Sequence, residues 1–365
     1  MALDRILLAD FRNHRETLIE GAAQFNLLVG ENGAGKTNVL EAISLFAPGR
    51  GLRRAPLADM PAQDGAGGFA VSAELSAQGG GVRLGTGMDA ARPGRRAVHV
   101  NLAETPAMRL AEWLSIGWLT PAMDRLFSEG AGARRRFLDR MVLAARPGHA
   151  RMTARLEQAV RERNRLLAEA ASPDPVWLDA IEQQIAETGC EVARARCAVV
   201  DALKDALAAL PDQPFARPSL CYQPGGPVDR DDLARALAAA RQRDRAAQRT
   251  LTGPHRDELA VTMAGKGQPA CDCSTGEQKA MLIAIVLAHS QWLQAAGAGE
   301  RRARLLLLDE VAAHLDPVRR EALFDRLRDG SAQVWLTGTE RAPFAAILGE
   351  AAVWRVSGGS VERVE

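Results

Sequence analysis

Short apolar runs separated by glycine-rich turns dominate the first hundred residues of the chain. Runs of this kind, bounded by turn-forming residues, predict β-strands. We expect strands at residues 5–9, 25–29, 69–75, 81–88 and 97–102, with a helix after the second of them. The first part of the chain is therefore predicted to consist mainly of β-sheet.

From about residue 105 the apolar residues take on a helical spacing, which predicts a different kind of structure. We expect helices at residues 131–145, 150–171, 176–210 and 229–245. In the third of these, Ile185, Val192 and Val199 recur every seven residues. A Ser-Pro-Asp-Pro turn at 172–175 separates the second helix from the third, so we expect the two to pair antiparallel with this stripe as their packing seam.

Strands and helices alternate again after residue 250. We expect strands at residues 259–263, 304–308, 334–337 and 353–356, and helices at residues 276–296 and 317–329. Neither α/β piece is complete alone, so the fold class is predicted to be α/β, with a head built from both chain ends and an inserted α-helical lobe or arm. The expected boundaries are 1–110 and 251–365 for the head and 111–250 for the insert.

A glycine-rich loop follows the strand at 25–29 and opens a helix. Its sequence fits GxxxxGK[ST], the P-loop or Walker A pattern, in the context that this motif requires. The glycines let backbone N–H groups turn towards phosphate oxygens, whereas the plain alternative is a glycine-rich turn. Lys36 would reach the β- and γ-phosphates of ATP, and Thr37 would ligate Mg²⁺. The expected nucleotide-binding residues of the loop are Gly30, Glu31, Asn32, Gly33, Ala34, Gly35, Lys36, Thr37 and Asn38.

Four leucines at 305–308 precede an acidic pair, Asp309 and Glu310. Such a run suits a strand buried on both faces of a parallel sheet, and ligands bind beyond the carboxyl ends of such strands. Asp309 is expected to hold Mg²⁺ through water, and Glu310 to polarise the attacking water. Glu310 and Lys36 are the expected catalytic residues. An acidic pair alone is weak evidence, but after a buried strand in a chain with a P-loop it is strong.

A Ser-Thr-Gly-Glu sequence at 274–277 opens the helix that precedes the acidic pair. Ser274 and Gly276 would present a hydroxyl and free N–H groups to an anion. The alternative is an ordinary helix cap in which Glu277 closes a capping box. Together with the P-loop and the acidic pair, the anion-binding interpretation is favoured.

The amino-acid composition is that of an ordinary globular protein. The 365 residues include 46 basic and 45 acidic side chains, for a net charge of +1, with 47% hydrophobic and 25% charged residues. This balance excludes a disordered or collagen-like chain. The apolar run at 280–288 is too short to span a bilayer and the N-terminus does not resemble a signal peptide, so we expect a soluble, cytoplasmic protein without a membrane partner.

The five cysteines form no CxxC pair, which argues against a disulfide framework or a four-cysteine zinc site. Cys271 and Cys273 could contribute to a soft-metal site or be free thiols, and no function is assigned to them.

The segment 132–165 carries ten arginines and three acidic residues. Such a cluster could bind DNA phosphates, or it could be a solvated helix face. Few aromatic residues accompany it, so contact with a duplex or junction backbone is favoured over base stacking. The candidate DNA-binding residues are Arg50, Arg53, Arg54, Arg134, Arg135, Arg151 and Arg155.

The order of P-loop, Ser-x-Gly and Asp-Glu resembles the ATP-binding-cassette ATPases. Further stretches narrow this resemblance: Asp-Phe-Arg-Asn-His at 10–14, Arg-Arg-Phe-Leu-Asp-Arg at 135–140 and Gly-Pro-His-Arg-Asp at 253–257. Together they resemble the RecF family of recombination mediators over almost the whole chain. The resemblance implies that Arg12 and Asn13 contact ATP.

The same resemblance implies a function. An ATP-dependent homodimer, in which Ser274 and Gly276 contact the nucleotide of the partner, would recognise gapped or junction DNA. With RecO and RecR it would promote loading of RecA in repair and replication restart. Thr337-Gly-Thr339 stands where many cassette ATPases carry a histidine, so we expect weak, DNA-stimulated hydrolysis that resets the dimer. The entry to the helical lobe, Pro-Ala-Met-Asp at 121–124, departs from the usual pattern of the family.

Two alternatives share the ATPase motifs. The ATPase subunit of a membrane transporter would not need the long helical insert, and a chromosome-structuring SMC-like head would need far longer heptad segments between its halves. Both therefore fit the chain less well.

Overall fold

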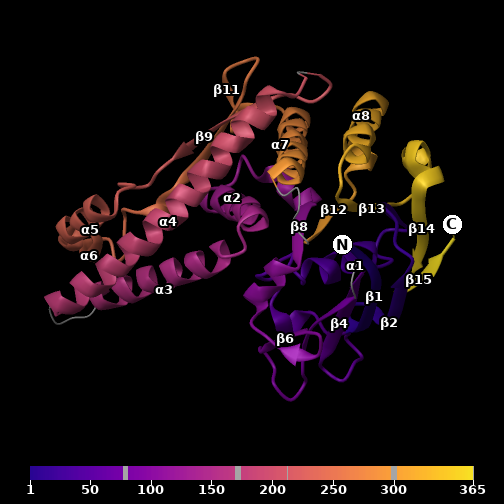
Figure 1. Cartoon of the computed structure of the whole chain (residues 1–365), viewed down its shortest axis with the longest axis horizontal. Coiled ribbons are helices and arrows are strands. Elements are labelled where there is room, and N and C mark those ends of the chain that lie inside the picture. Colours follow the sequence, from indigo (N-terminus) through magenta and orange to yellow (C-terminus); the bar gives the residue numbers. More distant parts are fainter. Residues whose placement is uncertain (77–80, 169–173, 212, 297–301, 365) are drawn as a thin grey trace. The chain divides into compact units, whose positions relative to one another are not determined.

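The computed structural model describes residues 1–76, 81–168, 174–211, 213–296 and 302–364 (Figure 1). The chain folds into two compact units. The head unit consists of residues Met1–Met123 and Ser290–Glu365, and the helical unit of Asp124–His289. The prediction of an α/β fold with a head built from both chain ends is therefore confirmed.

One sheet of the head unit has six strands, each antiparallel to its neighbours, in the order β2-β1-β4-β5-β6-β7. The strands are β1 (Ala2–Phe11), β2 (His14–Glu20), β4 (Phe69–Ser76), β5 (Val82–Met88), β6 (Arg96–Val100) and β7 (Ala103–Glu104). Alternation along β1 buries Ile6 and Leu8. Such alternation is typical of a sheet with one face against the core.

The second sheet of the head unit also has six strands, in the order β15-β14-β3-β13-β12-β8. All are parallel to their neighbours except β15, which runs antiparallel to β14. The strands are β3 (Phe25–Val29), β8 (Leu114–Leu119), β12 (Ala303–Leu308), β13 (Gln333–Gly338), β14 (Ala351–Ser357) and β15 (Ser360–Arg363). The predicted four-leucine strand is β12, buried between β13 and β8.

One core joins the two sheets of the head unit to α1 (Lys36–Ser44). It contains Ile6 from the antiparallel sheet, Leu40 from α1 and Leu307 from the parallel sheet. Trp335 and Trp354 stack in it with ring centroids 5.6 Å apart. Helix α8 (Pro317–Arg328) also belongs to the head unit and lies between β12 and β13 in the sequence.

The helical unit contains α2 (Ala131–Ala145), α3 (His149–Ala168), α4 (Pro175–Ala208), α5 (Arg230–Ala239), α6 (Arg241–Ala246) and the start of α7 (Thr275–Ala296). A three-stranded antiparallel sheet accompanies them, formed by β9 (Pro218–Gln223), β10 (Glu258–Met263) and β11 (Gln268–Pro269). The short 3₁₀ helices of the chain are Leu57–Asp59, Ala107–Glu112, Pro121–Arg125, Pro254–Arg256, Ala270–Asp272, Ala312–His314 and Ala342–Glu350.

Helices α3 and α4 lie side by side in the helical unit (Figure 1). Ile185 and Val192 of α4 are fully buried and share a core with Leu156 and Val160 of α3. The seven-residue stripe is thus a packing seam, as predicted. Residues 169–173, which include part of the predicted connecting turn, lie outside the described residues.

An arginine of the basic segment is the centre of a buried network. Arg163 is fully buried and pairs with Glu182 of α4 at 3.0 Å and with Asp244 of α6 at 2.7 Å. Its guanidinium also donates to Thr250 and to the carbonyl of Leu237. Removing one partner from such a network leaves an unpaired buried charge, so Arg163 is structural and is not available to DNA.

The units differ from the predicted segments in their boundaries, which lie at 123 and 290 instead of 110 and 250. The stretch expected to begin the helical insert contains β8, which pairs with β12 and so belongs to the parallel sheet. At the other boundary, β10 pairs with β9 of the helical unit. The predicted helix at 229–245 is two helices, because α5 ends and α6 begins at Ala240.

Candidate nucleotide-binding site

The P-loop connects β3 to α1 in the head unit, as predicted. Gly33 and Gly35 have φ angles of 81° and 116°, a conformation that side chains disfavour. A Cβ atom on Gly35 would also lie 2.7 Å from His14 Nε2. The loop therefore needs glycine at this position for two reasons, conformation and space.

Lys36 is buried, with 4% of its surface exposed, and its ammonium group lies against the loop. Nζ donates to the carbonyls of Gly30 at 2.7 Å and Glu31 at 2.8 Å. Burial lowers the pKa of Lys36, and the nearby Glu310 and Asp309 carboxylates oppose that effect. Because an ammonium has three N–H donors, one is left for a phosphate oxygen.

Asp309 follows β12 and receives two hydroxyl donors. Thr37 of α1 and Thr337 of β13 each donate to its Oδ1 at 2.9 Å. Burial raises the pKa of Asp309, and these two hydrogen bonds partly offset that rise. The cluster brings hard oxygen donors together at the end of the P-loop, which fits Mg²⁺ completed by phosphate oxygens and water.

Glu310 takes a backbone conformation that is rare for a residue with a side chain. Its φ is 54°, and its N–H donates to Thr337 Oγ1 at 2.8 Å. Such outliers cost on the order of 1 kcal/mol and cluster at functional sites. The single hydroxyl of Thr337 thus contacts both acidic residues, a link that the sequence pattern did not indicate.

The Phe-Arg-Asn turn between β1 and β2 lies beside the P-loop. Arg12 pairs with the fully buried Glu41 of α1 through Nε at 2.9 Å and Nη2 at 2.7 Å. Asn13 accepts a hydrogen bond from Asn38 at 2.7 Å. Arg53, predicted to bind DNA, contacts Glu41 at 2.9 Å and Asn38 at 2.6 Å. Arg12, Asn13 and Arg53 therefore form one polar cluster around the first turns of α1.

Ser274 and Gly276, in the helical unit, are both exposed. Ser274 N and Oγ each lie 2.9 Å from Glu277 Oε2, and Glu277 N lies 3.4 Å from Ser274 Oγ. This is the capping box that the sequence offered as an alternative. The cap leaves both residues at the surface, so it is compatible with the anion-binding interpretation.

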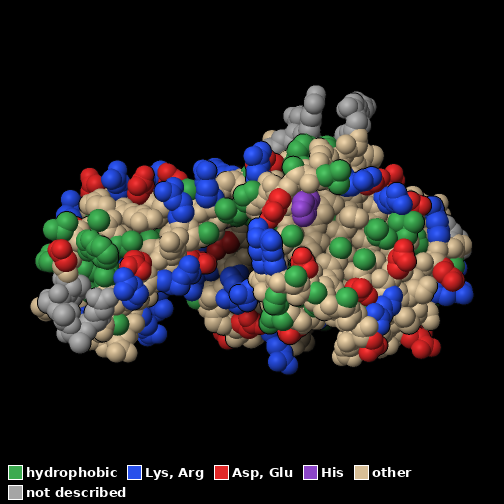
Figure 2. All heavy atoms as spheres, turned by 90° about the horizontal axis from the view of Figure 1, so that it is seen from below, with side chains coloured by type: hydrophobic (Ala, Val, Ile, Leu, Met, Phe, Trp, Pro, Cys, Tyr) green, Lys and Arg blue, Asp and Glu red, His purple; other side chains and the backbone are tan. Residues whose placement is uncertain are grey.

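Apart from Arg53, the arginines proposed to bind DNA fall into two groups. Arg134 forms two hydrogen bonds of 2.7 Å with Glu258, and Arg135 donates to the carbonyl of Asp257 at 2.7 Å. Arg50, Arg54, Arg151 and Arg155 are exposed. Among the described residues, Arg151 and Arg155 have no acidic partner. Figure 2 shows basic and acidic side chains intermingled on the helical unit. The number of arginines therefore does not identify a DNA-binding surface, and Arg151 and Arg155 are the better candidates because they lack an acidic partner in the part of the chain that the structure describes.

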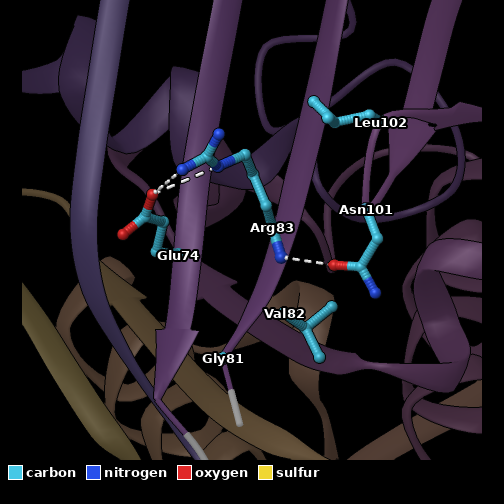
Figure 3. Close-up of a pocket in the computed structure, with 6 residues that line it drawn as sticks. All are labelled: Glu74, Gly81, Val82, Arg83, Asn101 and Leu102. Carbon is cyan, nitrogen blue, oxygen red and sulfur yellow. Dashed lines mark hydrogen bonds and ion pairs between the residues drawn. The ribbon is translucent and has the colours of Figure 1, made fainter.

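A surface pocket of the head unit lies away from these motifs in sequence. Glu74, Gly81, Val82, Arg83, Asn101 and Leu102 line it, on β4, β5 and the turn after β6 (Figure 3). Arg83 pairs with Glu74 at 2.8 Å, and its N–H donates to Asn101 at 2.9 Å. Because these polar groups already form hydrogen bonds with one another, we assign no function to the pocket.

The remaining expectations concern membrane-spanning helices and the cysteines. In the described ranges, the structure contains no helix that could cross a membrane. Cys271 is exposed and Cys273 buried, and no cluster of three or more potential metal ligands occurs in the part of the chain that the structure describes.

Comparison with known proteins identifies the family. The family model described as RecF/RecN/SMC N-terminal domain matches residues 2–347. The DNA replication and repair protein RecF of Mesorhizobium japonicum is 45% identical, over 100% of this chain and 98% of that protein. RecF of Brucella abortus is 43% identical, over 99% of this chain and 96% of that protein.

Solved structures agree at the level of the fold. A structure of the recombination mediator protein RecF with ATP superposes with a TM-score of 0.86 at 21% identity, covering 100% of this chain and 98% of that one. An SMC head bound to a domain of ScpA gives a TM-score of 0.53 at 16% identity, with coverage of 100% and 97%. By sequence identity over its full length, the chain belongs to the RecF family.

Proposed function

We propose that this chain is an ATP-dependent, DNA-binding recombination mediator of the RecFOR pathway. The family membership supports this function, as does the name of the similar solved structure, a recombination mediator with ATP in the RecFOR pathway. The observation that carries the proposal is the convergence of Thr37, Thr337 and Asp309 beside the P-loop.

The nucleotide step assigns a role to each residue of this cluster. The N–H groups of the P-loop and the Lys36 ammonium bind the phosphates of ATP. Thr37 and Asp309 would hold Mg²⁺, which would neutralise the negative charge of the phosphates. Glu310 orients the attacking water. Arg12 and Asn13 complete the binding surface from the turn between β1 and β2.

ATP then acts as a dimerisation switch. Ser274 and Gly276 of one protomer contact the nucleotide bound by the other, and their exposure in the single chain is compatible with that role. Because the position of the usual histidine is taken by Thr337 and its neighbours, hydrolysis is slow and serves to open the dimer.

The dimer binds DNA and acts with RecO and RecR to promote loading of RecA. Arg151 and Arg155 are the strongest candidates for phosphate contacts, because both are exposed without an acidic partner among the described residues. Arg134 and Arg135 are weaker candidates, because internal acceptors already engage their guanidinium groups. Repair of DNA in the cytoplasm is the setting that this function implies.

Lys36→Ala tests the nucleotide step directly. The variant should lose ATP binding, measured by calorimetric titration, and with it ATP-dependent retention of duplex DNA. Far-UV circular dichroism should stay unchanged, since both hydrogen bonds of the Lys36 ammonium that the described residues show go to carbonyls of the loop itself. An unchanged ATP titration in a folded variant would exclude the P-loop as the binding site.

A further inference from the structure

Two carbonyl groups of the P-loop are held from outside the loop. The carbonyl of Ala34 accepts hydrogen bonds from Asn13 Nδ2 at 3.0 Å and from the N–H of Gly359 at 3.1 Å. The carbonyl of Gly35 lies 3.1 Å from His14 Nε2 and also accepts from the N–H groups of Asn38 at 3.0 Å and Val39 at 3.2 Å, at the start of α1. Asn13 lies in the turn between β1 and β2, His14 is the first residue of β2, and Gly359 lies in the turn between β14 and β15, at the opposite end of the chain.

Holding these carbonyls fixes the direction of the N–H groups that phosphate would use. A peptide unit is planar and trans, so its C=O and N–H point in opposite directions. The Ala34 carbonyl shares a plane with the N–H of Gly35, and the Gly35 carbonyl shares one with the N–H of Lys36. Donors that hold the two oxygens from outside therefore hold the two N–H groups towards the inside of the loop.

The proton positions on His14 follow from its partners. A carbonyl oxygen only accepts, so Nε2 must carry the proton that is donated to Gly35. Nδ1 lies 2.9 Å from Thr17 Oγ1, and the Thr17 hydroxyl donates to the carbonyl of Gly359 at 3.0 Å. His14 is fully buried, and burial lowers its pKa. The contact with Gly35 therefore requires a proton on Nε2, whichever state Nδ1 takes.

The turn between β14 and β15 requires glycine where it approaches Asn13 and the P-loop. Gly358 and Gly359 have φ angles of 54° and 83° and form a two-residue hairpin loop, a conformation that favours glycine. A Cβ atom on Gly359 would lie 1.9 Å from the carbonyl oxygen of Asn13. Only glycine allows the approach that brings its N–H to the P-loop.

We propose that His14 is a positioning residue which, with Asn13 and Gly359, presets the P-loop backbone to receive phosphate. This inference rests on the proposed binding of ATP. It assigns the C-terminal hairpin a part in nucleotide affinity although that hairpin contributes no side chain to the P-loop. Because the N–H groups concerned belong to the part of the loop that cradles the α- and β-phosphates, ADP and ATP depend on them equally.

Calorimetric titration of His14→Leu with ATP and with ADP, both with Mg²⁺, tests the proposal. Losing one buried hydrogen-bond donor should weaken both ligands about tenfold and by the same factor. His14→Gln, which keeps a donor for Gly35, should restore affinity to within about threefold of the wild type. His289→Leu is the matched control, since it removes a buried histidine of the helical unit, which lies 3.0 Å from the carbonyl of Met141.

A folded His14→Leu variant with wild-type affinity, or one no weaker than His289→Leu, would overturn the proposal. A wild-type chain that binds no ATP would instead contradict the proposed function. If His14→Leu does not fold, nitrogen-15 NMR of the histidine side chains in the wild type decides. His14 should carry a proton on Nε2 at pH 7, and a proton on Nδ1 alone would refute the proposal.

Discussion

Replacing Thr337 by valine should remove a hydrogen bond from each of the two acidic residues, Asp309 and Glu310, that follow β12. The Thr337 side chain is buried, donates to Asp309 at 2.9 Å and accepts from the N–H of Glu310 at 2.8 Å. Valine has nearly the same shape but neither donates nor accepts. The change therefore removes two hydrogen bonds without creating a large cavity.

The magnitude follows from the kinds of hydrogen bond lost. A hydrogen bond to a charged group contributes about 1.5 to 3 kcal/mol to stability, and one between neutral groups about 1 kcal/mol. We expect the free energy of unfolding to fall by about 3 kcal/mol at pH 7 without nucleotide. The Thr337 hydrogen bond also opposes the rise in the pKa of Asp309 that burial causes, so that pKa should rise further in the variant.

Denaturant unfolding and steady-state ATPase assays check the two effects. Turnover should fall about tenfold, equivalent to a barrier about 1.4 kcal/mol higher, because Glu310 loses the hydroxyl that fixes its backbone. ATP should still bind, since the N–H groups of the P-loop and Lys36 are unchanged. Thr337→Ser keeps the hydroxyl and is the matched control. Wild-type turnover and stability in Thr337→Val would refute this reasoning.

Two further predictions concern stability and DNA binding. Burial lowers the pKa of His289 to about 4, so its contribution to stability is complete above about pH 6.5 and is lost as the pH falls towards 4. Urea unfolding at pH 7.5 and 5.0 should show wild type losing about 2 kcal/mol more than His289→Gln, and equal losses would contradict the assignment. Replacing both Arg151 and Arg155 by alanine should reduce the salt dependence of duplex binding by up to about two phosphate contacts. Arg161→Ala, which removes an arginine paired with Glu157, should change it less, and identical slopes for all three proteins would exclude α3 as the DNA surface.

The P-loop, the strand β12 and the long helices were predictable because their signals are local. A phosphate-binding loop needs its glycines and lysine close together in sequence, and a strand buried on both faces needs a continuous apolar run. The packing seam of α4 was visible for the same reason, since Ile185 and Val192 repeat within one helix.

Contacts between distant segments were not predictable in this way. His14 and Gly359 meet at the P-loop from opposite ends of the chain, and Thr337 reaches Asp309 from a neighbouring strand. No periodicity marks such partners. The strand β8 was missed because its apolar run borders a helical region, and pairing with β12 decides its structure.

Sedimentation velocity of Glu310→Gln with ATP, Mg²⁺ and a labelled DNA duplex tests the central claim most directly. The variant keeps the binding residues and lacks the group that orients water, so it should accumulate as an ATP-bound dimer. We predict a dimer that carries the duplex only when ATP is present, and a wild-type dimer that decays as ATP is consumed. A Glu310→Gln protein that binds ATP and remains monomeric would contradict the proposed ATP-driven dimer.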